Sequence, residues 1–385
     1  MICFAWAGFP QYAARCVAEV VRHTDERVVV VAAKPKVPIA GMDNLACCDV
    51  VWITYEERRP LKTLLGGCLP RVLFSTGWRD RVFRAFRDEV HKDGGLVIVM
   101  VDNNWMLGGV EWLRWRWWKL LIREFVKALR FRLILRRKYD GFIVPGKSGR
   151  RLLQFYGVPD EQVSVGMYSA DAKLFNDAGE VINRPQKILY VGQYIERKNV
   201  MRMASAFAEA IYQVQGAWTL EMYGSGGLKD DLCALAERIN QGLVAFGSKI
   251  VIHEFLQPEE IAPVYRSARI FCLPSLEEHW GLVVHEAALS GCYLLLSQYV
   301  GAAHDFLVQK KNAPSYVNGS MFDPYDEKAL REAFVRGMTM DKQSALLAQE
   351  ESVRVAQSVS LNLFAETIIN SVRKEGTRRH ETLGN

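Results

Sequence analysis

The sequence predicts an α/β protein with two Rossmann-like domains, and three observations support this prediction. At 385 residues the chain is long for one hydrophobic core and suits two, at roughly 150 residues per domain. Half of its residues are apolar and 24% are charged, which is the composition of an ordinary folded protein. Short apolar runs alternate with helix-like stretches along the chain, as in parallel sheets that helices cover on both faces.

The strand-like runs form two series. The first spans residues 1–7, 28–33, 49–53, 96–101 and 141–145, and the second spans 187–191, 218–223, 250–252, 270–273 and 293–296. Between them, residues 175–186 are polar and contain Gly179 and Pro185, which favours a linker. We therefore predict an N-terminal domain over 1–175, a C-terminal domain over 176–358, a helix over 359–378 and a disordered tail over 379–385.

The composition also bears on where the protein works. Its eight cysteines include no C-x-x-C pair, so reduced intracellular thiols are the simplest interpretation. The first residues resemble a strand entering the turn at Gly8 rather than a signal peptide. Apolar runs such as 96–101 are far shorter than the about 20 residues that cross a bilayer. We expect a cytoplasmic protein without a transmembrane helix.

Two carboxylates eight positions apart, Glu278 and Glu286, bracket the stretch that says most about chemistry. Residues 268–274 are typical of a short buried strand closed by proline, and residues 282–290 of a helix, which places Gly281 at a helix N-terminus. The unpaired backbone N–H groups and the helix dipole favour an anion such as phosphate there. Glu286 lies one turn into the helix, where its carboxylate can accept two hydrogen bonds from a diol. Phosphate, sugar and ribose could all be bound by this stretch.

Further ordered motifs accompany this stretch in the second half of the chain. They are Tyr190-Val-Gly-Gln-Tyr-Ile-Glu-Arg-Lys-Asn199, Tyr223-Gly-Ser-Gly226, Phe255-Leu256 with Val264-Tyr265, Pro274-Ser275, and the segments 297–303 and 319–326, with weaker matches at 144–148, Gly166 and 171–175. With these motifs the chain resembles the GT-B glycosyltransferases of family 4, which are retaining enzymes that use nucleotide-sugar donors. The resemblance implies two domains facing across a cleft and a C-terminal helix that crosses back to the first domain.

The resemblance also implies roles for individual residues. Glu286 would bind the donor ribose, Glu278 would lie near the donor sugar hydroxyls, and Lys198 would contact the diphosphate; we take Glu278 and Lys198 as the catalytic pair. The remaining expected donor-binding residues are Trp280, Gly281, Leu282 and Val283 through their backbone amides, Gln193 and Arg197 in the first motif, and Gly224 in the second. Gln193 stands where the family often has arginine, and Arg197 is the candidate substitute.

The expected reaction needs no cofactor and no metal. The sequence contains no Asp-x-Asp, which is the usual magnesium-binding signature of the other large glycosyltransferase fold. The helix terminus and Lys198 would stabilise the leaving diphosphate. Resemblance to retaining enzymes implies front-face attack, in which the departing phosphate takes the proton of the acceptor hydroxyl. A nucleotide-sugar isomerase on the same fold and a catalytically silent nucleotide-sugar-binding protein are the alternatives.

Two other patterns, a P-loop-like sequence and a His/Glu cluster, give only weak evidence for nucleotide hydrolysis and for metal binding. Residues 141–148 fit the P-loop pattern letter for letter, but Phe142-Ile-Val144 is itself strand-like and Pro145 removes a backbone donor. His279 and His285 flank the glutamates, yet His285 and Glu286 are adjacent on a helix and point about 100° apart, which disfavours a shared metal ion.

Loops after the strands of the first half are candidates for acceptor binding. Gly8 and Phe9 follow the first strand, and Asp102 and Asn103 follow the strand at 96–101. Asp102 could orient an acceptor hydroxyl, although an Asp-Asn-Asn run is equally ordinary turn chemistry. The expected acceptor is a glycolipid or an oligosaccharide in cell-surface glycan synthesis.

Residues 110–140 carry a net charge of +7, against +6 for the whole chain. A predicted long helix here has a basic stripe and, roughly opposite, an apolar stripe that includes Ile122, Phe125 and Leu129. This composition suits an anionic membrane surface at the inner face of the cell membrane. The expected membrane-facing residues are Trp115, Arg116, Trp118, Lys119, Arg123 and Lys127. Packing of the apolar stripe on the sheet is the alternative, and nothing favours nucleic-acid binding.

Overall fold

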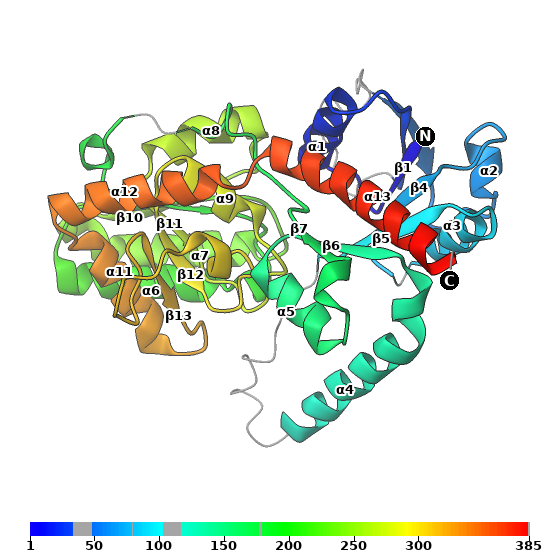
Figure 1. The fold of residues 1–385 in the computed structure, drawn as a ribbon. Helices are drawn as coiled ribbons and strands as arrows, with labels where there is room; N and C mark the ends of the chain where they lie inside the picture. The colour runs from blue at the N-terminus through cyan, green and yellow to red at the C-terminus, as the bar shows by residue number, and fades with distance from the viewer. Residues whose placement is uncertain (34–47, 79, 103–116, 177–178, 384–385) are drawn as a thin grey trace. The chain divides into compact units, whose positions relative to one another are not determined.

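The computed structural model describes residues 1–33, 48–78, 80–102, 117–176 and 179–383, which divide into two compact units (Figure 1). Unit 1 holds the described residues up to Ser169 together with those from Val359 onward. Unit 2 holds the described residues of Ala170–Ser358. Each unit is built on its own parallel sheet. The predicted class, two Rossmann-like α/β domains of the GT-B type, is confirmed.

The sheet of unit 1 has the strand order β3-β2-β1-β4-β5-β6-β7, and neighbouring strands are parallel. Its central strands are almost entirely buried because they are runs of valine, isoleucine and alanine with a helical layer on each face. The strands are β1 (Ile2–Trp6), β2 (Val28–Ala33), β3 (Asp49–Ile53), β4 (Val72–Thr76), β5 (Leu96–Met100), β6 (Gly141–Val144) and β7 (Val163–Val165).

The helices of unit 1 follow the strands as crossovers. They are α1 (Gln11–Arg22), α2 (Leu61–Leu64), α3 (Arg81–Lys92), α4 (Trp117–Arg130) and α5 (Lys147–Phe155). A π-helical turn (Phe131–Leu135) and a 3-10 turn (Arg136–Lys138) follow α4, and a second 3-10 turn (Asp160–Gln162) precedes β7. Helical structure thus covers 117–138 of the helix predicted over 110–140, whose residues 110–116 lie outside the described ranges.

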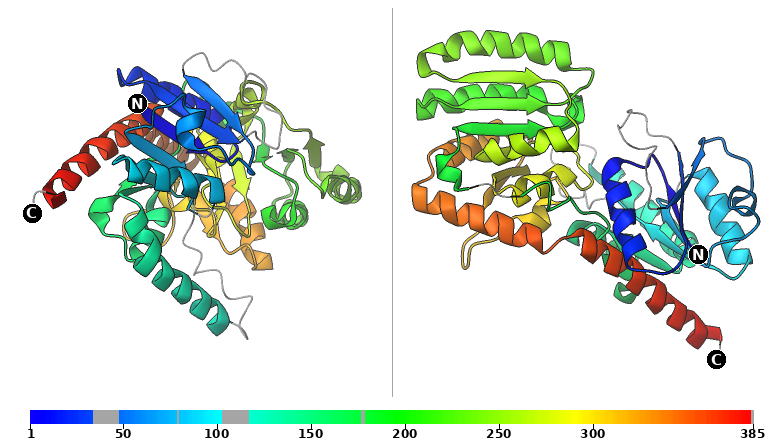
Figure 2. Two further views of the ribbon diagram at one scale, coloured as in Figure 1. Left: turned by 90° about the vertical axis from the view of Figure 1, so that its right-hand side faces the viewer. Right: turned by 90° about the horizontal axis from the view of Figure 1, so that it is seen from above.

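The C-terminal helix α13 (Leu361–Leu383) belongs to unit 1 and lies beside α1 (Figure 1 and Figure 2). Thr367 Oγ1 donates a hydrogen bond of 3.3 Å to the carbonyl of Val165. The helix continues through residues 379–383, which the sequence analysis expected to be disordered. Three of these five residues, Arg379, Glu381 and Leu383, are good helix formers.

Unit 2 contains a second parallel sheet with the strand order β10-β9-β8-β11-β12-β13. The strands are β8 (Lys187–Val191), β9 (Thr219–Tyr223), β10 (Lys249–His253), β11 (Ile270–Leu273), β12 (Tyr293–Ser297) and β13 (Gly319–Phe322). The helices are α6 (Val200–Val214), α7 (Lys229–Leu243), α8 (Pro258–Ser267), α9 (Leu282–Leu289), α10 (Ala303–Phe306), α11 (Glu327–Met338) and α12 (Lys342–Gln357). Short 3-10 turns cover Val181–Asn183, Glu196–Lys198 and Val244–Phe246.

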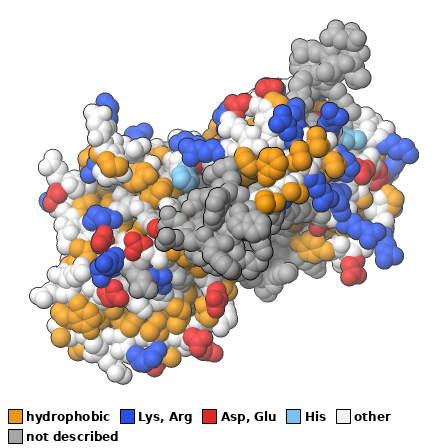
Figure 3. Space-filling view, turned by 90° about the horizontal axis from the view of Figure 1, so that it is seen from below, with side chains coloured by type: hydrophobic (Ala, Val, Ile, Leu, Met, Phe, Trp, Pro, Cys, Tyr) orange, Lys and Arg blue, Asp and Glu red, His pale blue; other side chains and the backbone are white. Residues whose placement is uncertain are grey.

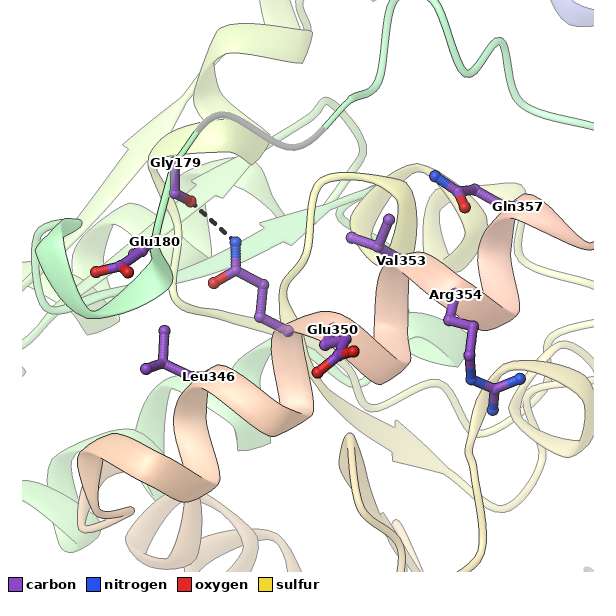
Figure 4. A pocket seen from close by; sticks show the side chains of 8 residues that line it. Gly179, Glu180, Leu346, Glu350, Val353, Arg354 and Gln357 are labelled. Carbon is purple, nitrogen blue, oxygen red and sulfur yellow. Dashed lines mark hydrogen bonds between the residues drawn. The ribbon is translucent and has the colours of Figure 1, made fainter.

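The described residues of the linker predicted over 175–186 are hydrogen-bonded to the body of unit 2. The buried Gln349 on α12 donates to the carbonyl of Gly179 at 2.9 Å and accepts from the N–H of Val181 at 2.7 Å. Figure 4 shows the groove beside α12 in which the first of these bonds is made. The Arg184 guanidinium donates to the carbonyls of Ala268 and Ser290 at 3.0 and 2.8 Å. Residues 179–184 are therefore part of the folded unit.

Candidate active site

The loops that carry the main motifs meet at the switch point of the sheet in unit 2. The chain runs from β8 outward to β10 and then returns to β11, which lies directly beside β8. Ligands in open parallel sheets bind where the strand order reverses in this way, outside the carboxyl ends of the strands. The loop 192–198 follows β8 and the loop 274–281 follows β11, so both expected catalytic residues lie at this point.

Lys198 and Glu278 form an ion pair across the switch point. Lys198 is only 7% exposed, and the same carboxylate accepts from the hydroxyl of Ser275 at 3.4 Å. Arg197 reaches this carboxylate at 3.8 Å and donates to the carbonyl of Glu277 at 2.9 Å. Lys198 is therefore a buried lysine and not part of the solvent-exposed surface. The arrangement places two cations and one carboxylate beside the start of α9.

Gly281 forms the N-cap of α9 with φ +89°, a left-handed conformation that glycine adopts at little cost. A Cβ at this position would lie 3.2 Å from Glu278 Cγ and 3.3 Å from Leu273 Cδ2, so the glycine also permits close packing. The preceding Trp280 is buried against Phe306, with a distance of 5.9 Å between ring centroids. The turn therefore holds the first backbone N–H groups of α9, those of Leu282 and Val283 among them, at the switch point, where an anion can accept from them.

Glu286 is oriented by Tyr265, whose phenol donates to its carboxylate at 2.8 Å. Burial raises the pKa of Tyr265 well above its usual value, and the Glu286 charge raises it further, so the phenol remains a donor. Tyr265 is a site residue whose role sequence reasoning missed. The residue belongs to the Val264-Tyr265 motif, but its place in helix α8, one strand away from α9, gives no local signal for its contact with Glu286.

Gly224 brings the loops after β8 and β9 together. A Cβ at Gly224 would lie 1.9 Å from the carbonyl oxygen of Gly192, so any other residue would force these backbones apart. The Gln193 side chain is exposed on the first of these loops, and its own carbonyl accepts from the buried Tyr190 phenol at 2.8 Å. The expected donor-binding residues of the second domain thus lie on the loops at the carboxyl edge of the sheet or, for Leu282, Val283 and Glu286, in α9.

His285 is a structural residue. Its Nδ1 accepts from the N–H of Ala170 at 3.0 Å, and its Nε2 lies 3.0 Å from the carbonyl of Ala356, so the ring is a neutral donor–acceptor. Burial lowers its pKa to about 4. Within the described ranges, no group of three or more His, Cys, Asp or Glu residues is placed to hold a metal ion.

The first unit has a switch point of its own, between β1 and β4. A pocket of about 370 Å³ lies there and includes Asp102, as the acceptor hypothesis expects. Gly8 adopts φ +65° in the turn after β1 but is not among the residues that line the pocket. The prediction that Phe9 contacts the acceptor is wrong, because Phe9 is fully buried against Trp6. Asn103 lies outside the described residues.

Helix α4 presents an exposed apolar face, which contradicts packing of this stripe on the sheet. Figure 3 shows the apolar stripe with lysine and arginine side chains on both sides. The exposed residues on α4 and the turn after it are Ile122, Phe125, Val126, Leu129, Leu133 and Ile134. Lys127 is half-buried and pairs with Glu124 at 2.6 Å. Trp115 and Arg116 lie outside the described residues, as do the side chains of Trp118, Lys119 and Arg123.

No helix in the part of the chain that the structure describes has the length and apolar character needed to cross a membrane. The P-loop interpretation fails on geometry, because Gly141 begins strand β6 instead of following a strand. Lys147 is the first residue of α5.

Comparison with known proteins agrees with the fold and with unit 2. Residues 174–350 match the family model described as Glycosyl transferases group 1. No curated protein sequence matches the chain. This match and the fold together indicate a glycosyltransferase, and the similarity to group 1 glycosyltransferases covers residues 174–350, most of unit 2.

Solved structures share this fold at low sequence identity. HepE from Anabaena in complex with UDP is 13% identical, with a TM-score of 0.68 over 97% of this chain and 99% of that chain. Sucrose-phosphate synthase from Thermosynechococcus elongatus is 17% identical, with a TM-score of 0.67 over 98% and 99%. A glycosyltransferase from Rickettsia africae is 12% identical, with a TM-score of 0.69 over 97% and 98%.

Proposed function

We propose that this glycosyltransferase is a retaining, metal-independent enzyme of the family 4 type. It moves a sugar from a nucleoside diphosphate to a hydroxyl of a glycolipid or polysaccharide. The observation that carries the proposal is the buried Lys198–Glu278 pair beside the N-terminus of α9 at the switch point of unit 2. The HepE structure with UDP supports a nucleoside diphosphate donor.

The positive groups of the site determine where the donor diphosphate binds. Its diphosphate accepts from the first N–H groups of α9 and lies near Lys198 and Arg197, because these are the positive groups at the switch point. The ribose diol donates to Glu286, which Tyr265 holds in position. Glu278 then lies on the sugar side of the phosphates, where its carboxylate accepts from sugar hydroxyls.

The reaction follows from this placement. As the bond from the anomeric carbon to the phosphate oxygen breaks, negative charge grows on the leaving diphosphate and positive charge grows on the sugar ring. The helix N-terminus and Lys198 stabilise the first charge, and the Glu278 carboxylate stabilises the second. The acceptor hydroxyl attacks the same face of the sugar, and its proton passes to the departing phosphate oxygen. No protein side chain has to serve as the base.

The exposed face of α4 supports a membrane-associated acceptor. Phe125, at 64% exposed, and Leu133, at 61%, are the most exposed members of its apolar stripe. Arg130, Arg132, Arg137 and Lys138 are exposed on the same segment. Apolar insertion combined with cations at the surface fits the headgroup region of an anionic bilayer, where each cation contributes about 1 kcal/mol. We propose that the enzyme binds the cytoplasmic membrane surface peripherally through α4.

Variants of the ion pair test the catalytic proposal. Lys198→Met should lower kcat/KM by about a hundredfold or more, because it removes a charge-assisted contact to the leaving group. Glu278→Gln should lower turnover while leaving nucleoside diphosphate affinity nearly unchanged. Lys229→Met is the matched control, since Lys229 pairs with Glu254 on the surface of the same unit. Full turnover in the Glu278→Gln variant would refute the catalytic role of Glu278, and a wild-type protein that binds donor but turns nothing over would favour the silent binding protein.

Product analysis separates the remaining possibilities. A panel of nucleotide sugars with and without acceptor, followed by NMR of the anomeric signal, should show transfer with retained configuration. An isomerised nucleotide sugar formed without acceptor would instead identify an isomerase.

Vesicle sedimentation tests the membrane proposal. The protein should sediment with anionic vesicles and remain in solution with neutral ones, and Phe125→Glu should abolish sedimentation. Leu347→Glu is the control, because Leu347 is 49% exposed on α12 of unit 2. If the protein stays in solution with both vesicle types, the membrane proposal is wrong.

A further inference from the structure

We propose that unit 2 has a second ligand site, at the edge of its sheet opposite the donor site, which binds a carboxylate carried on an apolar body. The site is a pocket of about 300 Å³, at the lower end of the range for small-molecule sites. At about 30 Å³ per water-sized group, this volume holds about ten such groups. The inference goes beyond the proposed transfer reaction and does not depend on it.

The amino ends of three strands form one side of the pocket. Trp218 directly precedes β9, Arg269 directly precedes β11, and Tyr293 is the first residue of β12. The donor loops follow the carboxyl ends of strands in the same sheet, so the two sites lie at opposite ends of these strands. The other side is formed by the end of α11, the start of α12 and the segment between them, through Gly337, Met338, Met340, Lys342 and Ala345.

The inner wall of the pocket is apolar and already packed. Trp218 is 3% exposed and Tyr293 is 9% exposed, and the Tyr293 hydroxyl donates to the carbonyl of Gly319 at 3.0 Å. Gly337 lets α11 approach this wall, because a Cβ there would lie 3.0 Å from Ile270 Cδ1. A wall that is fixed before the ligand arrives loses little entropy on binding.

The opposite side of the pocket is adaptable. Met338 and Met340 have unbranched side chains, which adjust to apolar groups of irregular shape. Ala345 on α12 contributes only a methyl group and leaves space beside them. A flexible alkyl chain fits such a surface.

The charged residues that line the pocket are both cations. Arg269 and Lys342 line it, and none of its described lining residues is aspartate or glutamate. Arg269 Nε and Nη2 donate to the carbonyls of Arg184 and Ile182 at 2.7 and 2.8 Å, which leaves Nη1 without a hydrogen-bond partner among the described residues. Asp341, the acid next to Lys342 in the chain, is engaged as the N-cap of α12.

An anion is the head group that these two cations favour. Burial lowers the pKa of Arg269, because its guanidinium is partly removed from water. A carboxylate that accepts from Nη1 would form a charge-assisted hydrogen bond there, and the exposed Lys342 would add a second attraction. The apolar body would meanwhile leave water for the wall around Trp218. Charge and shape together select a carboxylate on an apolar body.

Titration calorimetry of the full-length protein with octanoate, which has ten non-hydrogen atoms, tests the inference. Octanoate should bind saturably, and octanol should bind more weakly by about tenfold or more, because it lacks the charge-assisted hydrogen bond. Octylammonium has the wrong charge and acetate has no apolar body, so neither should bind. Equal affinities for octanoate and octanol would overturn the inference, as would failure of octanoate to bind.

NMR of methionine methyl groups locates the ligand. Among the 11 methionines of the chain, octanoate should shift the signals of Met338 and Met340, which the Met338→Leu and Met340→Leu variants assign. The signal of Met100, buried in β5 of unit 1, should stay in place. Octanoate binding that moves neither of the two pocket signals would place the ligand elsewhere and contradict the inference.

Two variants with matched controls complete the test, with folding checked by thermal melting. Ala345→Leu should abolish octanoate binding, because leucine fills the pocket and suits a helix, whereas Gln343→Leu adds the same side chain at an exposed position of α12 and should not. Lys342→Gln should weaken binding about twofold to fivefold, and Lys328→Gln, at the exposed start of α11, should leave it unchanged. Unchanged octanoate affinity in Ala345→Leu would refute the site and leave the proposed transfer reaction untouched.

Discussion

The neutral, buried His285 predicts a specific acid sensitivity of unit 2. The ring accepts from Ala170 and donates to Ala356, and both bonds require one protonated and one unprotonated nitrogen. Burial lowers its pKa to about 4 from an ordinary value of 6.5. The unfolded chain therefore binds a proton first as the pH falls. Stability from this residue is complete above pH 6.5 and is lost as the pH falls toward the folded-state pKa.

The size of the effect follows from the pKa difference. Each pH unit between the two values costs about 1.4 kcal/mol of unfolding free energy, so the full window costs about 3 kcal/mol and the step from neutral pH to about pH 5 costs about 2 kcal/mol. This is a large fraction of the 5–15 kcal/mol that stabilises a typical domain.

Urea unfolding of the wild type and of His285→Gln at several pH values measures this effect. Glutamine can accept from Ala170 through its oxygen and donate to Ala356 through its nitrogen, but it does not titrate. The pH dependence of the variant should therefore be shallower than that of the wild type by about 2 kcal/mol between neutral pH and about pH 5. Two curves that run parallel would refute the reasoning, as would an NMR titration of the His285 ring with a midpoint above pH 6.

Two further substitutions probe the donor site. Gly224→Ala should abolish donor binding and lower the melting temperature of unit 2, because its Cβ would lie 1.9 Å from the Gly192 carbonyl oxygen. The control is Gly227→Ala, whose Cβ would have no neighbour within 4 Å and which should change neither property. Equal effects of the two variants would contradict the packing argument. Tyr265→Phe should raise the donor KM several-fold, because Glu286 loses the hydrogen bond that orients it, and should lower stability by about 1 kcal/mol. An unchanged donor KM would show that the phenol does not orient the carboxylate.

Much of the fold was predictable because strand runs such as 28–33 and 96–101 are apolar throughout. Three strands were not predicted. β7 is three residues long, β13 begins with glycine and serine, and β4 directly follows Pro70 and Arg71, so none of them gives a clear periodic signal.

The site was predictable where a motif is local and not where it depends on distant packing. The start of α9 at Gly281 follows from its strand-glycine-helix pattern. The pairing of Lys198 with Glu278 spans eighty positions and depends on the order of the strands, which the sequence does not reveal. Phe9 was misassigned because a loop position alone does not show whether a side chain turns inward. For α4, the alternative that its apolar stripe packs on the sheet is contradicted by the exposed Phe125. An amphipathic pattern alone does not show whether the apolar face of a helix contacts the rest of the protein.

The imidazole of His285 also has a topological consequence. Ala170 is the first described residue of unit 2, and Ala356 lies two residues before its last. Because one ring bonds to both, the entrance and the exit of this unit lie within the span of a single side chain. The described part of unit 2 is therefore one continuous segment, residues 170–358 without 177–178, whose two chain ends are neighbours. In a protein made of residues 170–358 alone, the two termini would lie close together. A short peptide could then join them to make a circular or permuted domain.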